Sequence, residues 1–134
     1  MCFGARVEVD VNMPPCIICD RAFEFAARIV KLCDAMASRG FSGRHIASQL
    51  IRCGTSIGAN AEEAQEGQTK PDFIAKMFVS LKEARETRYW LRLIAACRPS
   101  LVHDVAPLLA ECEQLVAILT TILRNARMTP YRGK

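Results

Sequence analysis

The stretch RCGTSIGANAEEAQEGQTKPDFIAKMFVSLKEARETRYW, residues 52–90, decides the fold. Its apolar residues recur at helical spacing on both sides of a short polar turn. Gly67 is suited to end the first helix, and Pro71 is suited to the first position of the second. The stretch therefore predicts a helical hairpin, with helices over 42–66 and 71–97.

A helix is also predicted before the hairpin, over residues 20–38. Asp20 is a suitable N-cap, because its carboxylate can accept hydrogen bonds from the free N–H groups of the first turn. The apolar residues of this segment, Phe23 and Val30 among them, fall on one face, and charged residues fall on the other. We therefore expect Phe23 and Val30 to contribute to a core.

A fourth helix is predicted after the hairpin, over residues 104–127. Pro107 is tolerated only in the first turn of a helix, which makes Asp104 the expected N-cap. Leucine, isoleucine and valine then recur at helical spacing and form a broad apolar stripe. This pattern is typical of a helix that packs in a core.

Four helices with short connections predict an all-α protein, an antiparallel up-down-up-down four-helix bundle. The composition agrees, because 51% of the 134 residues are hydrophobic and only 7% are aromatic, which favours helices over sheets. The bundle is expected over 20–127, between an extended or disordered lead-in at 1–19 and a basic tail at 128–134. No uninterrupted apolar run approaches the roughly 18 residues of a membrane span.

A polar stripe runs beside the apolar face of the helix over 42–66. Because it adjoins the core, we expect Arg52 to pair with Glu83 or Glu86 of the next helix in a partly buried network that fixes helix register. The alternative is a solvated face with hydrogen bonds between successive turns. The residues predicted to form this structural polar network are Arg52, Ser56, Asn60, Glu63, Glu83 and Glu86.

Two glycines four residues apart, Gly54 and Gly58, lie inside the same helix. A helical glycine costs about 0.5–1 kcal/mol relative to alanine, so another helix is expected to approach closely there. That helix belongs either to the same bundle or to a second subunit. Tyr89 and Trp90 leave a similar choice between the core and an interface anchor. The candidate interface residues are therefore Gly54, Gly58, Tyr89 and Trp90.

The apolar face of the helix over 71–97 is interrupted by arginines. Its first half carries Phe78 and Leu81, and the same face then meets Arg85 and Arg92. Either the helix bends, or its second half is contacted from more than one side. The second explanation predicts an oligomer.

Basic residues gather on the helix over 71–97 and near the C-terminus. The net charge is +4, from 18 basic and 14 acidic residues, which permits an anionic partner without requiring one. Neighbouring glutamates could neutralise these charges, whereas a ring of identical subunits would repeat the patch and strengthen its field. The candidates for binding nucleic-acid phosphates are Lys82, Arg85, Arg88, Arg92, Arg124 and Arg127.

Seven cysteines are present, an odd number, and several lie on predicted apolar faces. We interpret them as buried free thiols in a reducing cytoplasm. Cys16 and Cys19 have the spacing of half a zinc site, but no second CxxC or spaced histidine pair follows. A redox pair usually follows a strand, and the proline-rich lead-in does not resemble one. With no nucleotide-binding loop or nucleophile motif either, we expect no metal, no cofactor and no enzyme activity.

Three segments, CGTSIGANAEEAQ, KPDFIAKM and LKEARETRYWLRLI, resemble the bacterial four-helix-bundle family of proteins encoded in intervening sequences of 23S rRNA genes. Accessory variability proteins of diversity-generating retroelements are similar to this family. The resemblance covers residues 20–125 and implies a ring-like homopentamer with a nucleic-acid-binding or scaffold role. The positions that carry it are Arg52, Ser56, Ile57, Asn60, Glu63, Asp72, Phe73, Lys82, Glu83, Glu86, Tyr89, Trp90 and Leu91.

These features together predict a cytoplasmic, non-enzymatic homo-oligomer, a pentamer, that binds RNA or DNA through repeated basic patches. The alternative is a protein–protein adaptor or scaffold that binds no nucleic acid. The expected partners are further copies of the chain, RNA or DNA, and another protein, but not a membrane.

Overall fold

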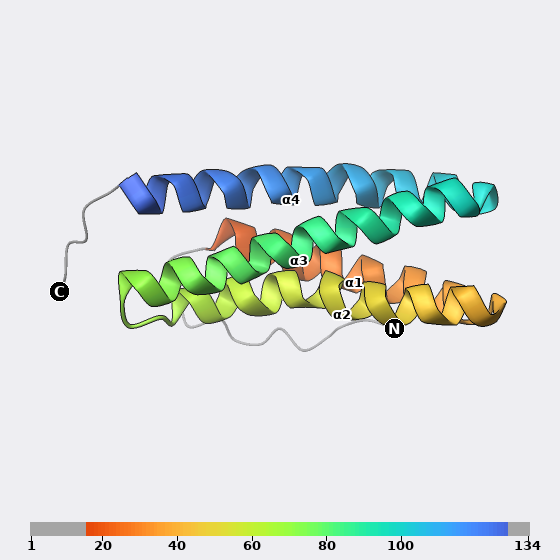
Figure 1. The fold of residues 1–134 in the computed structure, drawn as a ribbon, viewed down its shortest axis with the longest axis horizontal. Coiled ribbons are helices and arrows are strands. Elements are labelled where there is room, and N and C mark those ends of the chain that lie inside the picture. Colours follow the sequence, from red (N-terminus) through yellow and green to blue (C-terminus); the bar gives the residue numbers. More distant parts are fainter. Residues whose placement is uncertain (1–15, 129–134) are drawn as a thin grey trace.

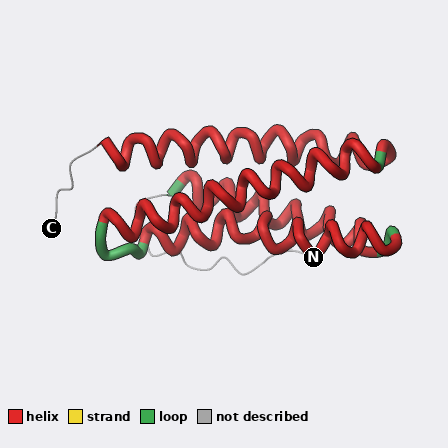
Figure 2. Tube along the Cα trace, in the orientation of Figure 1, coloured by secondary structure: helices red, strands yellow, loops and turns green. Residues whose placement is uncertain are grey.

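The computed structural model describes residues 16–128, which fold into four long helices and contain no strand. The helices are α1 (Ile17–Ala37), α2 (Gly40–Gln65), α3 (Lys70–Cys97) and α4 (Val102–Met128), and a 3₁₀ turn, η1 (Pro99–Leu101), precedes α4. The connections alternate between the two ends of the molecule, so consecutive helices are antiparallel (Figure 1). Short loops are the remaining elements of the described chain (Figure 2). The predicted all-α up-down-up-down arrangement is confirmed.

The helices form a closed four-membered bundle. Each of α1 and α3 packs against both α2 and α4, while the backbones of α1 and α3 are not neighbours. They therefore lie diagonally opposite each other, as in an ordinary antiparallel bundle. Surfaces between α1 and α2 and surfaces between α3 and α4 consequently face away from each other.

The first helix begins three residues before the predicted position. Cys16, not Asp20, is the N-cap of α1, and its Sγ accepts a hydrogen bond from the N–H of Cys19 at 3.3 Å. The predicted lead-in at 1–19 is therefore too long, because Ile18 and Cys19 are already buried in the bundle. The predicted tail at 128–134 begins one residue too early, because Met128 belongs to α4. Residues 1–15 of the lead-in and 129–134 of the tail lie outside the described residues.

The starts of α3 and α4 differ in whether the first turn is capped by a side chain. Thr69 caps α3, and its hydroxyl accepts a hydrogen bond from the N–H of Asp72 at 3.3 Å. Asp104 does not cap α4, because η1 supplies an earlier turn and α4 begins directly after it. Pro107 consequently lies inside α4 rather than at its first position.

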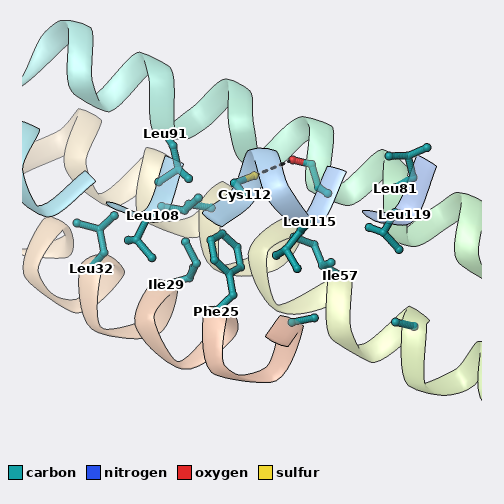
Figure 3. Packing of buried hydrophobic residues seen from close by; sticks show 14 of the residues in the cluster. Phe25, Ile29, Leu32, Ile57, Leu81, Leu91, Leu108, Cys112, Leu115 and Leu119 are labelled. Carbon is teal, nitrogen blue, oxygen red and sulfur yellow. Dashed lines mark hydrogen bonds between the residues drawn. The ribbon is translucent and has the colours of Figure 1, made fainter. Parts of the chain in front are cut away.

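The core is a continuous layer of aliphatic side chains between the four helices. Phe25 of α1 lies beside Leu115 of α4 in Figure 3, Ile29 points from α1 into the same layer, and all three are buried. The Cys112 thiol donates a hydrogen bond to the carbonyl oxygen of Ala84 at 3.2 Å, which ties α4 to α3 inside this layer (Figure 3).

The buried residues of α3 form one continuous stripe along the helix. This stripe continues through small and polar residues, Ala84 and Thr87, which the sequence analysis did not count as core. The arginines lie beside this stripe, so the helix needs neither a bend nor a second contact to bury its core side. The stripe consists of Met77, Ser80, Leu81, Ala84, Thr87, Leu91 and Ile94.

The segment Pro99–Met128, which contains α4, is long and apolar enough to cross a membrane by length and composition: an 18-residue window of it has a mean hydropathy of 1.5, and 28% of that window is buried. Its apolar runs are interrupted, which is why the sequence analysis did not single it out. Core helices of soluble proteins meet the same criterion, and α4 buries Val105, Leu115 and Leu119 against its neighbours.

Candidate functional sites

Arg52 joins α2 to α3 through two carboxylates. Its guanidinium forms an ion pair with Glu86 and a longer one with Glu83, whose oxygen lies 3.5 Å from Nη1. Gln49 accepts a further hydrogen bond from Nη2 at 3.3 Å. These side chains are part-exposed, so each pair stabilises the fold by no more than about 1 kcal/mol. They join α3 to α2 at one level along the two helices, and the register role expected of them stays a prediction.

The other predicted members of the polar network do not join this cluster. The hydroxyl of Ser56 donates to the Arg52 carbonyl at 2.6 Å, and the amide of Asn60 donates to the Ser56 carbonyl at 2.8 Å. Both are therefore satisfied within α2. Glu63 pairs separately with Lys76 of α3 at 2.8 Å, an exposed contact. The network is thus divided into an Arg52 cluster and a distant Glu63–Lys76 pair.

Gly54 and Gly58 make the close approach to α1 of the same chain. A Cβ at position 54 would stand 2.8 Å from Ile29, and one at position 58 would stand 3.3 Å from the Cβ of Ala22. Both glycines are buried within the chain. Of the two explanations for the glycine pair, the structure shows packing within the bundle, so neither glycine is exposed to contact a second subunit.

An aromatic cluster lies where α2 faces the second half of α3. Trp90 is half-buried, and its ring makes edge-to-face contacts with Tyr89 and His45 at centroid distances of 5.2 and 6.3 Å. Tyr89 is 53% exposed. The Trp90 Nε1 is buried without a hydrogen-bond partner among the described residues. Trp90 therefore shares the features of a core residue and of a surface anchor.

An apolar groove of about 600 Å³ runs along the outer side of α1 and α2. Phe23 is 66% exposed at its edge, and Val30 is also exposed. The expectation that these two residues enter the core is wrong, because Phe25 and Ile29 of the same helix turn inward instead. The apolar groove is lined by Phe23, Ala26, Ala27, Val30, Lys31, Thr55, Gly58, Ala59 and Glu62.

A basic groove of about 450 Å³ lies between α3 and the C-terminal part of α4. Three of the predicted nucleic-acid contacts, Arg85, Arg124 and Arg127, come together here. None of them forms an ion pair with a carboxylate of residues 16–128. The Arg127 guanidinium lies over the ring of Phe78, 5.9 Å from its centroid. The basic groove is lined by Phe78, Leu81, Arg85, Thr120, Leu123, Arg124, Arg127 and Met128.

The other three predicted contacts, Lys82, Arg88 and Arg92, lie on α3 but do not line the basic groove. Lys82 and Arg92 are exposed, and Arg88 is half-buried. Glu83 and Glu86 could have neutralised these three basic residues. They instead form ion pairs with Arg52 on the side of α3 that faces α2.

The described cysteines fall into three groups, one of which is Cys97 alone, a free thiol that is exposed and not buried as expected. Cys33, Cys53 and Cys112 are buried free thiols, and burial raises their pKa values to about 12, 11 and 12. Cys16 and Cys19, in contrast, form a disulfide at the start of α1, so the expectation of free thiols is wrong for this pair.

One site feature was missed by sequence reasoning. Phe78 was treated as core, although it is 41% exposed beside Arg127, which lies 49 positions further along the chain and gives no local signal. No cluster of three or more metal-ligating side chains occurs within residues 16–128.

A family profile described as "23S rRNA-intervening sequence protein" matches residues 16–121. Among solved structures, a protein of unknown function from the S23 ribosomal protein family of Bacteroides thetaiotaomicron matches with a TM-score of 0.74 and 34% sequence identity. That match covers 81% of the present chain and 99% of the other. No curated protein matches.

Proposed function

Because the chain belongs to the 23S rRNA-intervening sequence protein family, we propose that it is a non-enzymatic, cytoplasmic bundle that assembles with copies of itself and holds RNA or DNA by its phosphates. The observation that carries this proposal is the basic groove, where Arg85, Arg124 and Arg127 converge without carboxylate partners among the described residues.

Guanidinium groups are well suited to phosphate oxygens, because they carry a permanent charge and donate hydrogen bonds in a planar fork. Phe78 adds an exposed aromatic face beside Arg127, and a splayed base can stack on such a face. The groove therefore favours single-stranded nucleic acid and provides no pattern of donors and acceptors that would select a sequence.

Assembly is supported by the apolar groove on the opposite side of the bundle. An exposed phenylalanine and valine beside exposed alanines form a surface that a helix of another subunit can cover. We propose a ring-like homopentamer, in which the basic grooves stay outside the contacts and are repeated around the ring. Repetition would turn the modest charge of one chain into a multivalent surface.

Binding is tested with a fluorescent single-stranded RNA in a salt titration. Arg85→Gln, Arg124→Gln and Arg127→Gln should each weaken binding and lower the slope of log K against log salt by about 0.7, which is the value for one lost phosphate contact. Arg28→Gln is the matched control, because Arg28 is an exposed arginine on α1, diagonally opposite α3. Equal losses in all four variants, or no binding at low salt, would refute the proposal.

Assembly is tested by light scattering at micromolar concentration. The expected mass is five times that of the 14.9 kDa chain. Phe23→Glu should reduce this mass, whereas Glu24→Gln, next to it on the exposed side of α1, should not. A wild-type mass of one chain would overturn the assembly and leave the binding test unaffected.

A protein–protein adaptor is the second candidate, favoured by the same apolar groove if a different protein occupies it. In that case Phe23→Glu would leave the oligomer unchanged and abolish the capture of a protein that co-purifies after nuclease treatment.

A further inference from the structure

The disulfide at the start of α1 lies outside the functions proposed above. It joins Cys16, the N-cap of the helix, to Cys19 in the first turn. We propose that Cys16 and Cys19 form a reversible dithiol–disulfide pair that exchanges with accessible disulfides, with Cys16 as the attacking thiol and Cys19 as the resolving thiol.

The two sulfurs differ in exposure in the way that such roles require. Cys16 is half-buried at the end of the helix and borders a groove, whereas Cys19 is only 6% exposed. An external disulfide can therefore reach Cys16 but not Cys19. The buried thiol is in turn held within reach of its neighbour, because the two already share a turn of helix.

The backbone around Cys16 favours its thiolate form. The Cys19 N–H donates to the Cys16 Sγ at 3.3 Å, and the free N–H groups at a helix start carry partial positive charge. A thiolate, not a thiol, attacks disulfides. Cys97 provides the comparison, because it is an exposed free thiol at the last residue of α3 and has no helix N-terminus beside it.

A largely apolar groove of about 480 Å³ adjoins Cys16. Residues from all four helices line it, including Ile17, Phe73, Met77 and Ile122. Ile17 is 71% exposed at its edge. The groove suits a peptide whose disulfide is flanked by apolar side chains better than it suits a small charged disulfide.

The exchange takes place in two successive displacement steps. The Cys16 thiolate attacks one sulfur of the external disulfide, forms a mixed disulfide and releases the first thiolate, which takes a proton from water. The Cys19 thiolate then attacks the Cys16 sulfur, forms the internal disulfide and releases the second thiolate. Two electrons pass from the protein dithiol to the external disulfide, which leaves as two thiols.

The test uses the full chain in a Cys2→Ser, Cys97→Ser background, which keeps Cys16, Cys19 and the three buried thiols. The reduced protein is incubated with stepped ratios of reduced and oxidised glutathione, alkylated, and mapped by mass spectrometry. We expect Cys16 and Cys19 to lose their thiols together, while Cys33, Cys53 and Cys112 stay reduced. A second arm replaces oxidised glutathione with a peptide disulfide with apolar flanks, and the groove predicts that this reacts faster.

Single variants assign the roles. Cys19→Ser should accumulate a mixed disulfide at Cys16, at about ten times the yield seen at Cys19 in Cys16→Ser. A chain that retains Cys97 as its one accessible thiol should react about tenfold more slowly than Cys16 in the Cys19→Ser variant. Circular dichroism confirms that each variant is folded. Equal trapping at Cys16 and Cys19, or no internal disulfide at any glutathione ratio, would overturn the proposal.

Discussion

Gly54 of α2 lies directly against Ile29 of α1, so that a Cβ at position 54 would stand only 2.8 Å from the Ile29 Cγ2. Ile29 is itself fully buried and cannot move aside without disturbing the core. This contact sets how closely α1 and α2 can pack, and it accounts for a glycine in the interior of a helix.

Gly54→Ala should destabilise the protein although alanine is the better helix former. The gain in helix propensity is about 0.5–1 kcal/mol, and overpacking a rigid core costs about 1–3 kcal/mol, so we expect a net loss near 1 kcal/mol. Urea denaturation measures it. Gly58→Ala is the matched control, because its Cβ would stand 3.3 Å from Ala22 and needs only a small adjustment. A Gly54→Ala protein more stable than Gly58→Ala would contradict the packing argument.

The Arg52–Glu86 pair should show a small, salt-sensitive coupling energy. In a double-mutant cycle with Arg52→Gln and Glu86→Gln, we expect a coupling of up to about 1 kcal/mol that falls when salt is raised, because the side chains are part-exposed. The Lys76–Glu63 pair is the control. Its two side chains are together more exposed than those of Arg52 and Glu86, so its coupling energy should be smaller. A coupling unchanged by salt would show that the Arg52 cluster is more shielded from solvent than its exposure indicates.

Ser80→Ala should remove a stabilising contact between α2 and α3. The Ser80 hydroxyl is fully buried and donates to the Ile57 carbonyl at 2.7 Å. Loss of a buried hydrogen bond costs about 1 kcal/mol. Ser48→Ala provides the matched control, because Ser48 is an exposed residue of α2. The free energy of unfolding should fall for Ser80→Ala alone, and equal values for the two variants would exclude a role for this bond.

The stability of the fold should decline in alkali. Burial raises the pKa of Cys33, Cys53 and Cys112 from 9.0 to about 12, 11 and 12, so these thiols stay protonated in the folded protein while the unfolded chain loses its protons near pH 9. Their contribution is therefore fully present below pH 9 and is lost as pH rises toward 11–12. Denaturation at pH 8 and pH 10.5 measures the decline.

Cys112→Ala should make that decline shallower, because one of the three titrating thiols is gone. The substitution also lowers stability at pH 8, so the slope with pH, and not the absolute stability, is the quantity to compare. An unchanged slope would show that the Cys112 thiol does not titrate differently in the two states.

The helices were predictable because apolar spacing and turn residues act locally. Pro71 marks the start of α3 in the sequence, and it lies in the first turn of α3 in the structure. The inward direction of α1 was not predictable, because Phe23 and Phe25 are both apolar and only the positions of α2 and α4 decide which one is buried.

The candidate site was partly predictable for a similar reason. The pairing of Arg52 with Glu83 and Glu86 follows from charges on adjoining stripes of two consecutive helices. The basic groove depends on how far α4 extends along α3, and a helical pattern does not contain that register. Ser80 and Thr87 were not counted as core because hydroxyl side chains are usually exposed, whereas here each satisfies its hydroxyl with a backbone carbonyl.

The buried stripe of α3 includes Ser80, Ala84 and Thr87, and the basic residues of the helix lie beside this stripe. Lys82, Arg85 and Arg92 are exposed on this side of α3, so replacing them creates no cavity in the core, whereas Arg88 is half-buried. Different residues of α3 therefore carry the packing of the bundle and the charge of its surface. The charge on this side of α3 can consequently be changed by substitution while the core of the bundle stays intact.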